Sequence, residues 1–422
     1  SHLPTPTTGC ENSLKDFAAG PASQRTSTAD RFQPNRLHDT QEITDMQKKL
    51  IALAVAGLAS GAAAAQSNVT IYGVVDAGYI YSSGDAGRLR TGTNTFSGIA
   101  SGIAAGNRLG FRGEEALGNG LKAVFTLEYG LDIDTNQGIG TGGLNARQQF
   151  VGLASDKLGT VALGRQYSPG FNASARNDAL DATDMAIQSS LSALSGMTIT
   201  PNSPARFDNA VTYTSNNYSG FTFSAIYGFG ESNLGGYNNT SVYDNGKAGV
   251  GLNYANGPVN VDVVYQSRTN VVLPNPTPPP FKAPGSDKSI NEWYVGGSWD
   301  FKVVKAFASY QAMDNNTNFR VNPVDDAKLW TLGVNAPVGP GTLAFSYGKL
   351  TLDRNSAPDG DSWGAGTMYT YPLSKRTAVY AAYSYFSNDK YSIPGQAIIT
   401  PGLIGAPGEN NYTVGAGLMH SF

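Results

Sequence analysis

Residues 121–133 read LKAVFTLEYGLDI and contain the pattern that decides the fold. The seven odd positions are all apolar or aromatic, whereas the even positions include Lys122, Glu128 and Asp132. Successive side chains of a β-strand point to opposite faces, so this segment has one apolar face and one largely polar face. A period of two therefore predicts a strand with lipid on one side and water on the other.

The same alternation returns in many segments of the chain after residue 66. Clear examples lie at 69–79, 221–227, 250–254, 259–265, 343–347 and 379–385. A soluble sandwich of two sheets also alternates, but its apolar faces must supply one shared core. The length of the chain, the aromatic strand ends and the export signal described below favour a membrane barrel instead.

Seven short turns separate the predicted strands. They lie at 117–120, 156–159, 218–220, 256–258, 300–302, 337–341 and 372–375. Longer loops are predicted near 82–106, 135–145, 168–205, 230–246, 267–289, 313–327, 353–361 and 387–410. Seven turns and two chain ends on one side give eight hairpins, so we expect an all-β, closed antiparallel transmembrane barrel of sixteen strands. A barrel of that size encloses a water-filled interior.

The composition excludes several classes of function. The net charge of −3 does not suit a nucleic-acid-binding protein, so we expect no nucleic-acid partner. The single cysteine, Cys10, excludes a multi-thiolate metal site, and three histidines leave little for zinc or His-based catalysis. We therefore predict no catalytic residue, no metal and no cofactor.

The N-terminal region has a pattern of its own. Lys48 and Lys49 precede an apolar stretch at 50–59, and three alanines follow at 63–65. This order is typical of a secretory signal peptide, which we predict at 46–65. Residues 1–45 show neither strand alternation nor a helical stripe, and we interpret them as a non-native or disordered upstream extension. The mature chain is then expected to begin at Gln66.

Several motifs follow one another in a fixed order after the signal. They are VTIYGVVD at 69–76, NRLGFRG at 107–113, RQQFVGL at 147–153, LGRQ at 163–166 and MHSF at 419–422. This order resembles that of the general diffusion porins of the Gram-negative outer membrane, most closely the β-proteobacterial type. The resemblance covers 66–422 and implies a homotrimer of barrels surrounded by outer-membrane lipid and lipopolysaccharide. It also implies that the assembly machinery of that membrane reads the terminal Phe422.

A diffusion channel needs a narrow, hydrated section whose fixed charges select among solutes. The resemblance implies that the third loop, about 168–205, folds inward to form this constriction. Its candidate acids are Asp178, Asp181 and Asp184. The Pro-Glu-Phe-Gly-Gly signature of enterobacterial members is missing, and a second interpretation is that the aspartates only solvate the loop or cap a helix.

Candidate cations for the opposite wall come from strand parity and from the same resemblance. Parity places Arg108, Arg112 and Lys122 on the inner face of the barrel. The motifs around Arg108, Arg147 and Arg206 resemble those that hold the constriction arginines of anion-preferring members. The alternative interpretation is that these arginines form salt bridges at the rim of the barrel or in loops.

The orientations of Arg147 and Arg165 are judged from neighbours in the same predicted strands. Arg147 is taken as inward because it lies opposite in parity to Phe150. Arg165 resembles a constriction arginine of enterobacterial members, yet its parity matches the outward Val161 and Leu163. An arginine facing lipid at mid-depth costs about 2–4 kcal/mol, so we expect a β-bulge or a subunit contact at Arg165.

The predicted function is passive diffusion of small hydrophilic solutes and ions, with a weak preference for anions. One alternative is a substrate-selective channel, which would carry an aromatic or lysine ladder through its interior. Another alternative is an adhesin, in which the loops bind a partner and the pore is incidental. A hydrolase barrel would need a Ser–His pair, and His420 is the one histidine after residue 66.

Overall fold

The fold comes from a computed structural model of the 422-residue chain. It describes residues 68–84, 94–135, 145–230, 246–269, 289–316, 326–353, 358–391 and 408–422. The predicted extension at 1–45, the signal peptide at 46–65 and the mature start at Gln66 lie outside these residues.

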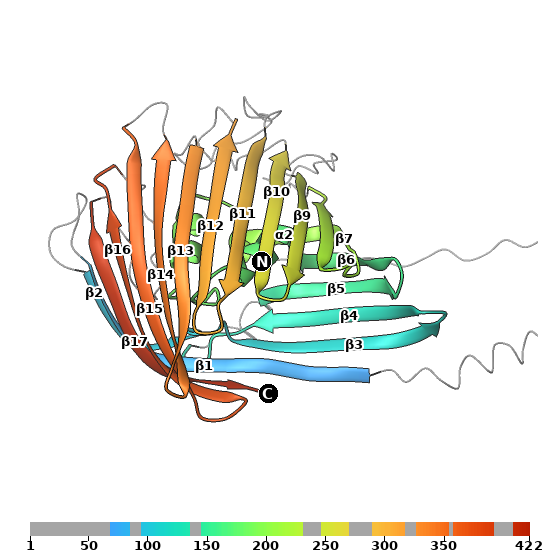
Figure 1. The fold of residues 1–422 in the computed structure, drawn as a ribbon, viewed down its shortest axis with the longest axis horizontal. Coiled ribbons are helices and arrows are strands. Elements are labelled where there is room, and N and C mark those ends of the chain that lie inside the picture. The colour runs from blue at the N-terminus through green and yellow to red at the C-terminus, as the bar shows by residue number, and fades with distance from the viewer. Residues whose placement is uncertain are drawn as a thin grey trace, which may run out of the picture. The chain divides into compact units, whose positions relative to one another are not determined.

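The described residues form one antiparallel sheet that closes on itself, as predicted (Figure 1). Strands that are neighbours in sequence pair with each other from β3 to β17, and β1 closes the ring by pairing with both β3 and β17. The strands are β1 (Asn68–Gly84), β2 (Asn94–Ser101), β3 (Arg108–Gly118), β4 (Leu121–Gly130), β5 (Asn145–Ser155), β6 (Gly159–Tyr167), β7 (Arg206–Thr214), β8 (Phe221–Gly228), β9 (Gly246–Asn256), β10 (Val259–Thr269), β11 (Ile290–Asp300), β12 (Lys305–Asn315), β13 (Asp326–Val338), β14 (Gly341–Asp353), β15 (Gly360–Pro372), β16 (Thr377–Asn388) and β17 (Asn410–Ser421).

Two of these strands share one position in the barrel. β2 pairs with the stretch of β1 from Ala77 to Gly84, and β3 pairs with the stretch from Asn68 to Val74. The seventeen described segments therefore fill sixteen positions, and the predicted sixteen-stranded barrel is confirmed. The prediction of one uninterrupted loop at 82–106 was wrong, because β1 runs to Gly84 and β2 covers Asn94–Ser101. The residues of β2, NTFSGIAS, do not alternate between apolar and polar, so the pattern does not predict this strand.

The short turns, the start of β1 and the end of β17 lie at the same end of the barrel, which we call the turn end. Each of the seven predicted turns falls between two paired strands, from β3–β4 to β15–β16. Gly73 and Phe422 exchange two backbone hydrogen bonds of 3.2 and 3.1 Å there. A Cβ at Gly73 would lie 2.3 Å from the Phe422 ring, so only glycine leaves room for the terminal side chain.

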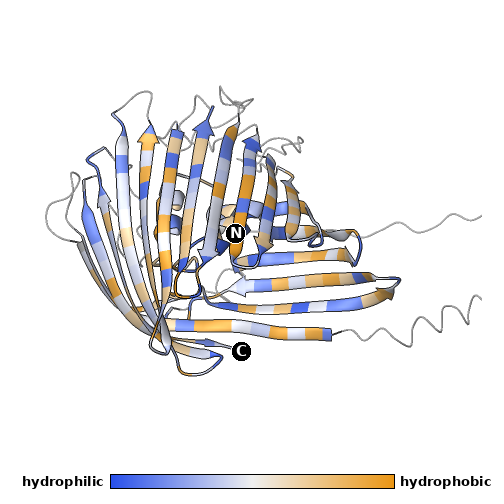
Figure 2. Cartoon of the chain, viewed as in Figure 1, coloured by the Kyte–Doolittle hydropathy of each residue, from blue (hydrophilic) through white to orange (hydrophobic). Residues whose placement is uncertain are grey.

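Hydrophilic and hydrophobic residues follow one another along the strands (Figure 2), and many large apolar side chains are exposed on the outer face. On β6, Val161 and Leu163 are 47% and 58% exposed, whereas Ala162 between them is 2% exposed. Among the described residues, no helix is long and apolar enough to cross a bilayer.

Aromatic side chains form a belt on the outer face of β13 to β16. Successive ring centroids of this belt are 5.4, 5.8 and 5.3 Å apart, in the order Trp330, Tyr347, Trp363 and Tyr385. Such belts mark the level where a membrane protein meets the lipid headgroups.

The segment between β6 and β7, which we call the third loop, packs inside the barrel, so its predicted inward folding is confirmed. It contains α2 (Pro169–Arg176), α3 (Ile187–Leu194) and the 3₁₀ helix η1 (Ser203–Ala205). Ser168 caps α2 by accepting the Phe171 N–H at 3.1 Å, and Pro169 starts the helix where its missing N–H is not needed. α2 contacts β9 and β10, and α3 contacts β13, β14 and β15.

The main hydrophobic core lies between the third loop and the inner wall. Six loop side chains in it are completely buried, namely Leu180, Met185, Ala186, Ile187, Leu191 and Met197. They pack against inward side chains of β11 to β16 and of β1. Each large apolar side chain buried in this way stabilises the fold by about 1.5–3 kcal/mol. These side chains therefore hold the third loop tightly against the inner wall of the barrel.

Candidate functional site

A glutamate on the inner wall gathers three neighbouring side chains. Glu128 of β4 accepts hydrogen bonds from Arg147 Nε at 2.8 Å, from the Tyr167 hydroxyl at 2.8 Å and from the Tyr72 hydroxyl at 3.0 Å. The side chains of Arg147 and Glu128 are only 14% and 6% exposed. A buried charge that loses its partner is strongly destabilising. The ion pair therefore holds the side chains of Arg147 and Glu128 in one position.

Arg206 extends this group along the wall. Its guanidinium lies 5.7 Å from the ring centroids of both Tyr167 and Phe171. These two rings are themselves stacked, with their centroids 3.8 Å apart. Stacking on aromatic faces holds a guanidinium without neutralising it.

Arg108 lies on the other side of the same group. Its Nε donates to the Gly106 carbonyl at 3.1 Å, and Arg147 and Glu128 are among the charges that act on it. Arg147 and Glu128 also act on Arg206. The structure therefore brings together three of the predicted cations around one carboxylate. We call the following residues the arginine cluster: Arg108, Arg147, Arg206 and Glu128.

Arg147 reaches this cluster through a β-bulge and not through parity. The pairing of β4 with β5 shifts after Glu128, which leaves Arg147 as an extra residue on β5. Val151 is 59% exposed on the outer face, whereas Phe150 lines a cavity inside the barrel. The parity argument from Phe150 was therefore wrong, because the bulge turns Arg147 inward.

Arg165 also lies at an irregularity of the sheet. The pairing of β6 with β7 shifts between Gly164 and Gln166, and a β-bulge was one of the two expected explanations, the other being a subunit contact. Arg165 Nε donates to the Ala146 carbonyl of β5 at 2.8 Å, and its guanidinium forms an ion pair with Asp208 of β7. Arg165 thus links three strands, and Asp208 offsets its charge.

The other two predicted cations lie closer to the turn end. Arg112 is 5.2 Å from the centroid of the Tyr72 ring and lines a cavity of about 370 Å³. Lys122 forms an exposed ion pair with Glu114 at 3.3 Å. Neither side chain joins the arginine cluster.

Asp178 does not face the arginines. It is 3% exposed, and its carboxylate accepts the backbone N–H groups of Leu180 at 3.1 Å and Ala182 at 3.2 Å. Burial raises the pKa of Asp178 to about 7, although these two hydrogen bonds oppose the rise. Asp178 therefore stabilises a turn of its own loop.

Asp181 and Asp184 have exposed side chains on the same loop. Lys305 of β12 acts on Asp181, whereas Arg147 acts on Asp184. Of the three predicted acids, Asp184 is the one that lies within electrostatic range of the arginine cluster.

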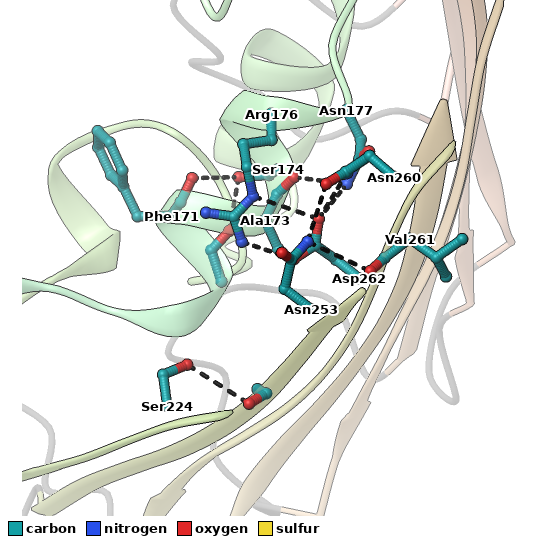
Figure 3. Close-up of polar contacts among 12 residues, drawn as sticks. Phe171, Ala173, Ser174, Arg176, Asn177, Ser224, Asn253, Asn260, Val261 and Asp262 are labelled. Carbon is teal, nitrogen blue, oxygen red and sulfur yellow. Dashed lines mark hydrogen bonds and ion pairs between the residues drawn. The ribbon is translucent and has the colours of Figure 1, made fainter. Parts of the chain in front are cut away.

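Polar contacts fasten one part of the third loop to the wall (Figure 3). Asp262 of β10 forms an ion pair with Arg176 at 2.6 Å, where α2 ends. It also accepts hydrogen bonds from the amides of Asn177, Asn253 and Asn260, at 2.8, 3.1 and 3.1 Å. This set of donors satisfies a carboxylate that is only 1% exposed.

A second carboxylate fastens the loop further along. Glu292 of β11 accepts the backbone N–H groups of Thr198 and Ile199 at 2.8 and 2.9 Å, and the Thr198 hydroxyl at 2.7 Å. Arg268 lies 3.7 Å from the same carboxylate and donates to the Gly196 carbonyl at 3.1 Å. The loop is therefore held at two places, and its position against the wall is well defined.

Sequence reasoning missed the carboxylates Glu128, Asp262 and Glu292. Each occupies an inward position in an alternating strand, so parity could have found it. A carboxylate at a buried, inward position needs a cationic or N–H partner, which marks it as part of a network. Within the described ranges, no group of three or more His, Cys, Asp or Glu side chains could hold a metal ion.

This arrangement can act on a passing solute through fixed charge. The arginine cluster contains three cations and one carboxylate, which leaves a formal charge of +3 − 1 = +2 on one wall. Charges that line a narrow passage with low-dielectric walls raise the local concentration of ions of the opposite sign.

The chain is similar to known proteins over most of its length. The family profile of the Gram-negative porins matches residues 52–391. An outer membrane porin protein of Bordetella pertussis is 30% identical over 384 residues, which are 81% of this chain and 95% of that protein. Outer membrane porin protein 32 of Delftia acidovorans is 30% identical over 385 residues, which are 89% and 100% of the two chains.

Solved structures share the fold. The anion-selective porin from Comamonas acidovorans matches with a TM-score of 0.68 at 24% identity, over 85% of this chain and 100% of that one. OmpT of Vibrio cholerae, in its trimer form, matches with a TM-score of 0.57 at 14% identity, over 84% and 99%. The chain therefore belongs to the Gram-negative porin family and is a channel-forming barrel of the outer membrane.

Proposed function

We propose that this porin passes small hydrophilic solutes and ions with a weak preference for anions. The arginines Arg108, Arg147 and Arg206 select the anions, and Asp184 is the acid across from them. One observation carries the proposal: Arg147 forms an ion pair with Glu128, and the guanidiniums of Arg108 and Arg206 lie within electrostatic range of both, so one carboxylate stands against three cations. Counting Asp184 as well leaves a local formal charge of +3 − 2 = +1.

The local charge decides selectivity even though the whole chain has a net charge of −3. Charges further away than a Debye length of about 8–10 Å are largely screened at ordinary salt concentrations. Arginine also stays protonated at every relevant pH, so the cluster keeps its charge. The structurally similar porin from Comamonas acidovorans is described as anion-selective, which agrees with this sign.

We also propose that the protein is a homotrimer surrounded by outer-membrane lipid and lipopolysaccharide. The trimer form of the Vibrio cholerae OmpT and the aromatic belt on β13 to β16 support this arrangement. The assembly machinery would read the strand that ends at Phe422, whose backbone closes the barrel against Gly73.

A planar bilayer recording across a KCl gradient tests the proposed function. We expect conductance to appear in groups of three steps, and a zero-current potential whose sign shows chloride to be more permeable than potassium. A potential of the opposite sign would contradict the anion preference, and single isolated steps would contradict the trimer.

A further inference from the structure

We propose that Asp76 of β1 is a positioning residue for the arginine cluster. Its carboxylate shapes the segment 102–107, and this segment holds Arg108 on one side and meets the third loop on the other. The inference rests on the proposed function and adds to it a residue that acts on selectivity through its neighbours.

The segment 102–107 is an inward insertion between β2 and β3, the two strands that share one position in the barrel. Ser101 is the last residue of β2 and pairs with Ala77, whereas Arg108 is the first residue of β3 and pairs with Val74. Six residues therefore occupy the space opposite two residues of β1, which are Val75 and Asp76. The insertion cannot continue the ladder, so its backbone polar groups need other partners.

Asp76 supplies these partners. Its Oδ2 accepts the backbone N–H groups of Ala104 at 2.6 Å and Ala105 at 2.7 Å, and its backbone carbonyl accepts the Gly102 N–H at 2.9 Å. Its Oδ1 accepts the Tyr380 hydroxyl from β16. Asp76 is 0% exposed, so its charge is used within this network and not presented to solvent.

Asn107 closes the other end of the insertion on the same residue. Its side-chain carbonyl accepts the backbone N–H of Asp76, and its side-chain amide donates to the backbone carbonyl of Asp76 at 3.0 Å. The insertion is thus tied at both ends to one position of β1.

The insertion in turn touches both sides of the constriction. The Gly106 carbonyl accepts Arg108 Nε at 3.1 Å, and a Cβ added at Gly106 would lie 3.2 Å from an Nη atom of Arg147. On the other side, the Ile103 carbonyl accepts the backbone N–H of Asp184 at 3.2 Å. Two arginines and the facing acid of the third loop therefore rest on a segment that Asp76 organises.

Two roles of Asp76 predict shifts of opposite sign. If Asp76 acted only as a negative charge near the passage, then its neutralisation would increase the preference for anions. If Asp76 positions the arginines, then its neutralisation loosens Arg108 and Arg147 and weakens that preference. The sign of the change therefore separates the two roles.

The test is the zero-current potential of Asp76→Asn in a KCl gradient, recorded beside the wild type and the triple variant Arg108→Ser, Arg147→Ser, Arg206→Ser. We expect Asp76→Asn to shift the potential toward cations, by part of the shift of the triple variant. Tyr380→Phe keeps the carboxylate but removes one hydrogen bond, so it should shift the potential in the same direction by less. The exposed Glu115→Gln is a matched control that should leave the potential unchanged.

An unchanged potential, or a shift toward anions, in Asp76→Asn would overturn the inference. If Asp76→Asn does not assemble, Tyr380→Phe decides the question by the same criterion. A triple variant without any shift would reject the proposed anion filter itself, so the two failures can be told apart.

Discussion

The inner wall of the barrel has two unlike halves. From β11 to β16 it carries apolar side chains such as Leu329, Leu350 and Phe386, which are at most 1% exposed beneath the third loop. From β3 to β7 it carries the arginine cluster and remains polar. Both halves show the same alternation on the outside. The residues of the outer face therefore depend on contact with lipid, whereas those of the inner face depend on whether the third loop covers them.

In the proposed channel, this difference lets the third loop form one side of a charged passage. Apolar packing on β11 to β16 and the two carboxylates Asp262 of β10 and Glu292 of β11 hold the loop against that side of the wall. We propose that the half from β3 to β7 faces the loop across the passage and presents the arginines. The next three predictions change the loop or its anchor and leave the arginine cluster intact.

The largest effect is expected from Leu191→Asp. Leu191 is completely buried between α3 and the wall, and an unpaired carboxylate there carries a large desolvation penalty. The loop should leave the apolar half, so single-channel conductance should rise and the open-channel current should become noisy. Ala193→Asp, on an exposed position of the same helix, is the matched control and should behave as wild type. A wild-type conductance in Leu191→Asp would show that apolar packing does not hold the loop.

A smaller effect is expected from Glu292→Ala. This change leaves the buried N–H groups of Thr198 and Ile199 without their acceptor, at a cost of about 1–3 kcal/mol for each group. Hydrogen exchange at these two amides should become faster, while the amide of Phe171 at the start of α2 keeps its wild-type rate. Equal exchange rates in the variant and the wild type would mean that Glu292 does not anchor this part of the loop.

The smallest effect concerns pH and the buried Asp178. Its pKa is about 7 in the folded chain and about 4 in an unfolded chain, so the folded state binds more protons between these values. Its contribution to stability is complete below about pH 4 and is lost as the pH rises through about 7. Thermal unfolding should show a stability that falls over this range in the wild type and falls less in Asp178→Asn. The exposed turn variant Asp156→Asn should keep the wild-type slope, and an identical slope in Asp178→Asn would refute this account.

Much of the fold could be predicted from the sequence because lipid imposes a strict rule on every strand. The alternation in 121–133 and the seven short turns predict the strands and their order, and the structure agrees. β2 at Asn94–Ser101 could not be predicted, because its residues NTFSGIAS do not alternate between apolar and polar. The sequence also does not reveal the insertion at 102–107, because the hydrogen bonds that hold it to Asp76 join distant parts of the chain.

The candidate site was predictable only in part. Arg108 follows from parity, but Arg147 turns inward at a bulge, which depends on the pairing of two strands. The loop aspartates look alike in sequence, yet Asp178 is buried and Asp184 is exposed, because the fold of the loop alone decides between them. Glu128 was visible on the polar face of its strand, but its role needs the positions of its three donors.

The zero-current potential of two equally charged variants tests the central claim most directly. One variant replaces Arg108 and Arg147 of the arginine cluster by serine. The other variant replaces Arg112 and Lys122, which lie near the turn end, by serine. Both remove two positive charges, so a filter that responds to total charge would treat them alike. We predict a large shift toward cations in the first variant and little change in the second. Equal shifts in the two variants would contradict the claim that the arginine cluster selects the ions.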